Sequence, residues 1–331
     1  MDYDYREDEF ANDKLQAEKP SLSATLETLK SISEGSIPAP LYYGLSGLSP
    51  ADIAQLQPVW ETIDPYQRHV LLAELAEASE LNFDFDYREL GFFALDDPDG
   101  SVREAAIELL WEEESPELMA RLIDIAQWDD SIAARAAATS ALGRFVLLGE
   151  YEEIGAAETE RVQDTIIGIL TNNDEDVDVR RRALEAISNC GHEIVPGVIE
   201  EAYESAEHKM QISALYAMGR TYDADTWGET VLRELGSYDA EMRYEAARSA
   251  GELEIKEAVP GLGRMAVDDE REVQEVAIWS LGEIGGREAL RILSTLVEDA
   301  EANEDESLVE AIEDAIGNAS LVGDSLDLDD A

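Results

Sequence analysis

A nine-residue phrase recurs along this chain, and its spacing constrains the fold more than any other feature of the sequence. A typical copy begins at a position that is often Arg, has Ala three residues later, and ends in Gly after a small and an apolar residue. Clear copies begin at Arg135, Gln211, Arg243 and Gln274, and looser copies at Arg68, Arg103, Arg180 and Val309. Successive copies lie 31 to 35 residues apart, with one interval of 45 residues. This period is typical of helical solenoids, so the sequence predicts an all-α fold with one continuous core.

The residues between the copies predict that the helices come in pairs. The first helix of a pair begins beside a proline, as at Pro196 and Pro260, because proline fits the first helical turn. The second begins after an acidic turn, such as residues 96–99 or 268–270, whose carboxylates cap the helix. The long interval contains an insertion near residues 148–159, which we expect to form a longer loop.

The pattern divides the chain into three regions. Residues 1–40 form an acidic, partly disordered N-terminal segment with a short amphipathic piece near residues 21–32, and residues 34–50 have the composition of a linker or irregular cap. Residues 41–320 form the solenoid, with clear repeats over 96–320. The acidic tail, residues 321–331, is expected to be disordered.

One unit carries a family resemblance. The segment AVPGLGRMAVDDEREVQEVAIWSLGEIGG, residues 258–286, resembles a HEAT repeat of the short bacterial type, which also occurs in the phycobilisome-lyase group. The resemblance covers roughly residues 96–320 and implies a right-handed α-α superhelix of about seven to eight helix pairs. The family includes scaffolds, adaptors, chaperone-like factors and bilin lyases, so the resemblance indicates a fold and leaves the activity open.

The repeated letters of the phrase have structural roles. The Ala at the fourth position shares a helix face with the phrase's first and eighth residues, and it lets neighbouring helices approach closely. The Arg at the first position lies at the edge of that face, and in the family that the chain resembles such arginines tie repeats together through Asp–Arg pairs. The Gly at the ninth position is expected where the second helix begins to end.

The charge of the chain limits its partners. It holds 76 acidic and 24 basic residues, a formal net charge of −52. Binding to nucleic acid or to an anionic bilayer depends on basic residues, so neither partner is expected. The acidity either keeps an elongated protein soluble or reflects a high-salt cytoplasm, and the sequence leaves both open.

Cysteine usage and hydropathy favour a soluble cytoplasmic protein, which we expect to be a monomer. The single cysteine, Cys190, excludes an internal disulfide. No apolar run reaches the length of a membrane span, and the N-terminus is acidic where a signal peptide is basic.

The sequence shows no constellation of catalytic or metal-binding residues. The histidines, His69, His192 and His208, do not have metal-ligand spacing, and there is no HExxH, CxxC, G-x-S-x-G or Walker loop. His192 lies beside Cys190, but a loop-capping role is favoured because no third group is present to orient a thiol pair. We therefore expect neither an enzyme nor a cofactor.

The candidate binding residues lie between the repeated letters, on the face of the second helices that would line a concave groove. They are Arg144, Arg181, Arg182, Tyr216, Arg220, Tyr244, Arg248 and Trp279. Exposed Arg, Tyr and Trp are the composition of an interaction hot spot. The alternative is structural: Arg181 and Arg248 pair with Glu185 and Glu252, four residues on, and the aromatic rings cover gaps between helices.

Two functions follow as hypotheses. The first is a non-enzymatic scaffold or adaptor that binds a protein or peptide in the groove, where arginines suit an acidic or phosphorylated segment. The second rests on the family resemblance alone: a bilin lyase or related tetrapyrrole-handling protein, with groove arginines holding the propionates.

Overall fold

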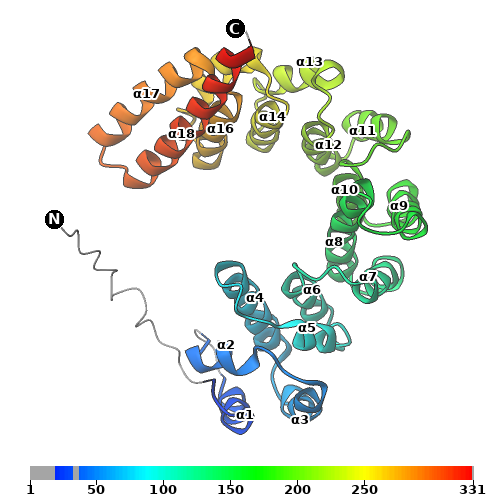
Figure 1. Cartoon of the computed structure of the whole chain (residues 1–331). Coiled ribbons are helices and arrows are strands. Elements are labelled where there is room, and N and C mark those ends of the chain that lie inside the picture. The colour runs from blue at the N-terminus through cyan, green and yellow to red at the C-terminus, as the bar shows by residue number, and fades with distance from the viewer. Residues whose placement is uncertain (1–18, 33–36, 330–331) are drawn as a thin grey trace, which may run out of the picture. The chain divides into compact units, whose positions relative to one another are not determined.

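The computed structural model describes residues 19–32 and 37–329, and these residues form helices joined by turns, with no β-strand (Figure 1). The α-helices are α1 Leu22–Lys30, α2 Ala39–Leu45, α3 Pro50–Trp60, α4 Pro65–Leu81, α5 Arg88–Ala94, α6 Gly100–Leu109, α7 Pro116–Trp128, α8 Ile132–Glu150, α9 Ala156–Thr171, α10 Val177–Ile187, α11 Val195–Tyr203, α12 His208–Arg220, α13 Ala224–Glu234, α14 Ala240–Glu252, α15 Val259–Met265, α16 Arg271–Ile284, α17 Gly286–Ala302 and α18 Glu306–Asp329. A 3-10 helix, Lys256–Ala258, precedes α15. The predicted all-α fold is confirmed, while the hand of the superhelix and the number of repeats stay predictions.

The chain divides into two compact units, Met1–Ala141 and Leu142–Ala331, which we call unit 1 and unit 2. In unit 1, α4 packs against α6 and α3 against α5. In unit 2, the second helices α10, α12, α14, α16 and α18 pack against one another in sequence. Within unit 2, Figure 1 shows α10, α12, α14 and α16 in one layer, on the inner side of the bend, and α9, α11 and α13 in the other. We call the solvent-facing side of the first of these layers the second-helix face.

Acidic caps begin many of the helices, as the sequence predicts. Asp99, Asp176 and Asp239 each accept a hydrogen bond from a backbone N–H in the first turn of α6, α10 and α14. These bonds satisfy amide groups that would otherwise lack a partner at the helix start.

The alanines of the phrase form the closely packed core. Six of them are completely buried: Ala106, Ala138, Ala183, Ala214, Ala246 and Ala277. Their small side chains let adjacent helices approach.

The glycines at the ninth position have a packing role that the sequence does not reveal. Gly219, Gly251 and Gly282 lie in the last turn of their helices, and each faces the next second helix at its seventh phrase position, which is Ser249, Ser280 or Ala315. A methyl group on Gly219, Gly251 or Gly282 would lie 2.9 to 3.0 Å from the Cα of the facing Ser or Ala. The predicted position near the helix end is confirmed for these three glycines, while Gly143 lies well inside α8, which continues to Glu150. Glycine is required because two backbones touch.

Serines strengthen this contact between successive second helices. Ser249 of α14 donates a hydrogen bond of 2.7 Å to the carbonyl oxygen of Leu215 in α12, and Ser280 of α16 donates one of 2.8 Å to Ala247 in α14. Both serines are fully buried. Each serine hydroxyl reaches the carbonyl of the preceding second helix because the two helices lie this close. The buried hydroxyl thus has a hydrogen-bond partner without water, and the same bond recurs in two consecutive repeats.

The arginines at the first position join repeats as expected at several sites. Arg243 donates two hydrogen bonds of 3.0 Å to Asp268 in the next acidic turn and a third to the carbonyl of Ser237. Arg103 holds Asp129 in the same way, and buried Arg68 pairs with Asp97. Arg180 instead donates to the carbonyl of Leu170.

Three expectations about irregular regions need correction. The insertion near residues 148–159 lengthens helices instead of forming a long loop, because α8 continues to Glu150 and α9 begins at Ala156. The region taken as a linker, residues 34–50, contains α2. The acidic tail is helical as far as Asp329 in α18. Of the N-terminal segment, α1 matches the amphipathic piece, and residues 1–18 lie outside the described residues.

One helix, α8, is long and apolar enough to cross a membrane by length and composition alone. Its apolar character has a structural explanation, because Ala138, Leu142, Phe145 and Val146 are completely buried within the protein. We therefore interpret α8 as a core helix.

Replacing Gly282 with Ala should destabilise the protein by ~1–3 kcal/mol, since the new methyl group would meet the backbone and side chain of Ala315. The matched control is Gly168→Ala in α9, where nothing lies within 4 Å of the added methyl group. That change should stabilise the protein by ~0.5–1 kcal/mol, because alanine favours the helix. Equilibrium unfolding in denaturant measures both, and equal stabilities of the two variants would contradict the close contact.

Arg243→Ala should lower the free energy of unfolding by ~2–4 kcal/mol at neutral pH, because it leaves Asp268 without its partner. Burial raises the pKa of Asp268, but the bonds from Arg243 and the backbone outweigh it and hold the pKa below its ordinary value. The contribution is thus present above the unfolded pKa of 3.8 and is lost as the pH falls through the lower folded value. Unfolding curves of both proteins between pH 7 and 3 should converge at the acid end. Arg264→Ala, at an exposed arginine, should change stability by less than ~0.5 kcal/mol.

Candidate functional site

The predicted site residues lie on consecutive second helices, one, two, five or nine residues after the start of the phrase. Arg144 is on α8, Arg181 and Arg182 on α10, Tyr216 and Arg220 on α12, Tyr244 and Arg248 on α14, and Trp279 on α16. All eight belong to unit 2. Because the close helix contacts fix the register, equal positions of the phrase fall on the same face.

Glu185 holds the α10 end of this face. It accepts a 3.2 Å hydrogen bond from Arg181 and a 2.6 Å bond from Arg182, both in its own helix. It also accepts a 2.6 Å bond from the hydroxyl of Ser213 in α12. The carboxylate therefore fixes two arginines and joins two repeats.

Tyr216 and Glu252 organise the next two helices. The guanidinium carbons of Arg248 and Arg220 lie 4.8 and 5.4 Å from the centroid of the Tyr216 ring, within the range of a cation–π interaction. Both arginines also pair with Glu252, at 3.2 and 3.5 Å. The tyrosine thus lies between two arginines, one from its own helix and one from α14.

A third carboxylate, Glu245 of α14, lies between these two clusters. Its Oε2 atom is inaccessible to solvent and accepts no hydrogen bond. Burial raises the pKa of Glu245 to about 7, and the charges of Glu185 and Glu252 add to the rise, while Arg248 and Arg181 oppose it. Glu245 therefore changes charge near neutral pH, at the centre of the face.

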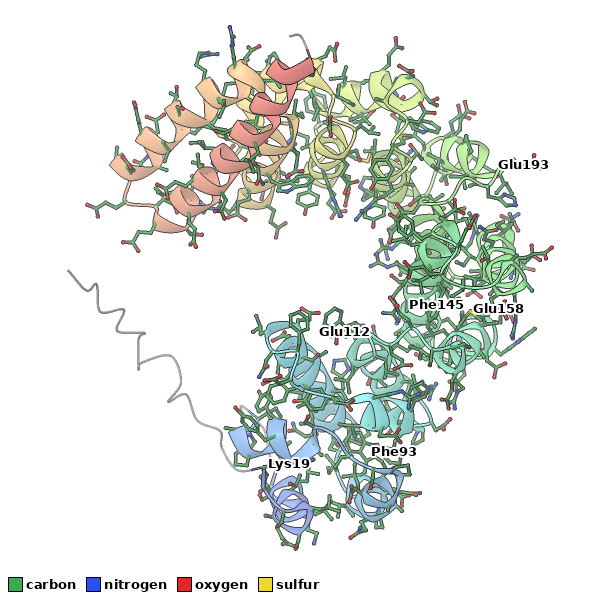
Figure 2. All side chains as sticks on the ribbon, viewed as in Figure 1. Lys19, Phe93, Glu112, Phe145, Glu158 and Glu193 are labelled. Atoms are coloured by element: carbon green, nitrogen blue, oxygen red, sulfur yellow. The ribbon has the colours of Figure 1, made fainter. Side chains whose placement is uncertain are left out.

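We call this set the arginine–glutamate network. Its members are Arg181, Arg182, Glu185, Ser213, Tyr216, Arg220, Glu245, Arg248 and Glu252. It holds four arginines against three glutamates, one of which is partly protonated at neutral pH, within a chain whose net charge is −52. On the other layer of unit 2, Figure 2 labels acidic Glu158 of α9 and Glu193, ahead of α11, both exposed.

The remaining predicted residues lie outside the network. The Arg144 guanidinium lies 5.5 Å from the ring centroid of its neighbour Phe145. Among the described residues, no hydrogen bond or ring contact joins Tyr244 or Trp279 to the network. Trp279 is 38% exposed, which is unusual for so large an apolar side chain.

The alternative interpretation, in which the arginines pair with glutamates on their own helices, is confirmed for two of them. Arg181–Glu185 and Arg248–Glu252 form as the helical spacing predicts, and Tyr216 packs between α12 and α14. Pairing does not remove the side chains from solvent, since the side chain of Arg182 stays 38% exposed. The face is both internally paired and accessible.

Glu245 was not predicted as a site residue. The sequence places a glutamate there, but exposed glutamates are abundant in this chain, and the repeat position does not reveal burial. The signal that could have revealed it is the presence of Glu185 and Glu252 nearby on the second helices. Carboxylates that lie close together raise one another's pKa, so one of them is expected to hold its proton at higher pH.

The groups considered for catalysis have structural contacts. The Nδ1–H of His69 donates to the carbonyl of Ser101, and His192 Nδ1 accepts the backbone N–H of Ile194, a loop-capping bond. Burial raises the pKa of the Cys190 thiol, which disfavours a reactive thiolate. No group of three or more His, Cys, Asp or Glu side chains suited to a metal ion occurs within residues 19–32 and 37–329.

Glu245→Gln should stabilise the protein at pH 8 by ~1–3 kcal/mol. The folded pKa of about 7 exceeds the ordinary 4.5, so the folded state retains the proton longer, and wild-type stability falls as the pH rises between these values. The gain should therefore disappear below about pH 4.5. Unfolding of both proteins at several pH values tests this, with exposed Glu275→Gln as the control. A gain that does not depend on pH would contradict the raised pKa.

Comparison with known proteins identifies the repeats. The family model described as HEAT repeats matches residues 228–313, which include α14 to α17. A search of curated proteins found no match.

Several solved structures resemble the chain. The Escherichia coli protein YibA aligns with 17% identity and a TM-score of 0.48 over 87% of this chain and 98% of its own. Importin beta aligns with 17% identity and a TM-score of 0.42, covering 90% of this chain and 41% of its own. Human deoxyhypusine hydroxylase in complex with glycerol gives 16% identity and a TM-score of 0.34, over 90% and 96%. The family model identifies HEAT repeats over residues 228–313, and the described residues form an all-α solenoid of this type.

Proposed function

We propose that the protein is a non-enzymatic scaffold that binds a protein or peptide on the second-helix face of unit 2. The observation that supports this most directly is the arginine–glutamate network beside the exposed Trp279. Exposed Trp, Tyr and Arg side chains supply much of the binding energy of protein interfaces. The HEAT-repeat solenoid is commonly a protein-interaction scaffold, which is consistent with this proposal.

Rigidity favours binding at this face. The close contacts at Gly219 and Gly251 and the serine hydrogen bonds hold α12, α14 and α16 in fixed register. A partner therefore meets side chains that are already ordered, and association costs less conformational entropy.

The charge of the network favours a partner segment with carboxylate or phosphate groups. Four arginines face three glutamates, and Arg182 is accessible from solvent. Glutamates already pair with these arginines, so a partner anion must compete with them, and this competition adds selectivity. The surrounding negative charge repels anions that lack a matching shape.

The other expectations stand as parts of the same proposal. We propose a cytoplasmic monomer that binds neither nucleic acid nor a membrane, consistent with the charge of −52 and the single buried cysteine. Nothing in the structure or the comparisons supports the bilin lyase alternative.

Arg182→Glu combined with Trp279→Ala should abolish partner binding without unfolding the protein, because both side chains are partly exposed. Full-length protein and variant are immobilised, and the proteins retained from a lysate of the source cells are compared by mass spectrometry. The affinity of a retained partner is then measured and should fall at least about tenfold.

The control changes one arginine and one aromatic residue away from the face. Arg161→Glu and Tyr238→Ala alter exposed side chains of α9 and of the turn before α14. This variant should retain the wild-type set of partners. An unchanged set in the Arg182/Trp279 variant would contradict binding at the second-helix face.

A further inference from the structure

A second surface with a different charge lies in unit 1, around the turn between α4 and α5. Leu81 and Phe83 are 89% and 73% exposed, although both are large apolar side chains. Beside them is a pocket of about 310 Å³, whose aromatic lining residues are Phe83, Phe85, Tyr87 and Trp111. We call it the aromatic pocket.

The aromatic pocket is held in place by hydrogen bonds, so the exposure of Phe83 does not result from a loose turn. The indole N–H of Trp111 donates a 2.9 Å bond to the hydroxyl of Ser79. Asn82 accepts bonds from the backbone of residues 84 and 85, and the carbonyl of Asp86 accepts the N–H of Gly47. The rings of Phe83 and Trp111 are tilted by 50° with centroids 6.3 Å apart. At this separation the two rings form an aromatic pair, so they lie together at one side of the pocket.

The rim of the pocket is acidic. Glu112 lines the pocket, and Asp84 and Glu114 adjoin the lining residues Phe83 and Glu113 in the chain; we call these three the rim carboxylates. All three are exposed, and none of the described residues forms an ion pair with them. The one cation in the lining, Arg88, is already paired with Glu89, Glu113 and Glu117 and lies over the ring of Phe92. The accessible charge around the exposed rings is therefore negative.

We propose that the aromatic pocket binds a basic segment of a partner protein. A Lys or Arg side chain lies against Phe83 and Trp111, because the faces of aromatic rings attract cations, and neighbouring basic residues pair with the three rim carboxylates. An acidic segment is excluded by repulsion, and a purely apolar one leaves the rim carboxylates without partners. This surface is separate from the second-helix face of unit 2, where the arginines favour the opposite charge.

The experiment measures binding of a fluorescein-labelled peptide in which lysines alternate with glycine and serine, using the full-length protein at physiological salt. A matched peptide with glutamate in place of lysine should not bind. Phe83→Ala should weaken binding of the lysine peptide about tenfold, a change that leaves the fold intact because the ring is largely exposed. Tyr66→Ala, at an exposed tyrosine of α4, should leave the affinity unchanged.

A second pair of variants separates this site from the general attraction of an acidic protein for a basic peptide. Asp84→Asn, Glu112→Gln and Glu114→Gln are combined in one protein and should weaken binding at least about tenfold. The control combines Glu288→Gln, Glu298→Gln and Asp314→Asn, exposed acidic residues of α17 and α18, and should change the affinity less than about twofold. Equal losses in the two triple variants, or unchanged binding in Phe83→Ala, would overturn the proposal.

Discussion

The structure of unit 2 depends on the contact between successive second helices at a glycine of one repeat and a Ser or Ala of the next. At Gly219, Gly251 and Gly282 the facing Cα lies so close that no side chain fits between the two backbones. The contact sets the distance at which Ser249 and Ser280 reach a carbonyl of the preceding helix. It also sets the register, so residues at equal positions of the phrase come to lie side by side. The arginine–glutamate network is a consequence of that register.

The arginines of the chain divide into two classes by their partners. Arg103 and Arg243 reach across to an aspartate in the next acidic turn and join repeats at the helix starts. Arg181 and Arg248 pair with glutamates one turn along their own helices and stay accessible on the second-helix face. An acidic chain with few cations thus uses some of them for cohesion and places others where a partner can reach them. Removing an arginine of the first class should affect stability, and removing one of the second class should affect binding.

Much of this architecture could be predicted from the sequence. The phrase predicted helix pairs, the buried alanines and the repeat-joining arginines, because these depend on periodicity and on residue size. The role of the glycines could not be predicted, since a glycine near the end of a helix fits a helix-ending turn equally well, and only the neighbouring helix distinguishes the two. The burial of Glu245 depends on how the neighbouring second helices pack around it, which the repeat pattern does not encode. The aromatic pocket depends on the turn at Asn82, which is not part of the repeated phrase.

The most direct test of this account is amide hydrogen exchange in the Gly251→Val variant, compared with wild type. If the contact between α14 and α16 holds the repeats together, a side chain at this position must separate two backbones that touch at Ser280. Protection should then fall in both α14 and α16, while α9, which is remote in the order of repeats, keeps its wild-type protection. Loss of protection confined to the turn around residue 251, with α16 unchanged, would contradict the central role of the contact.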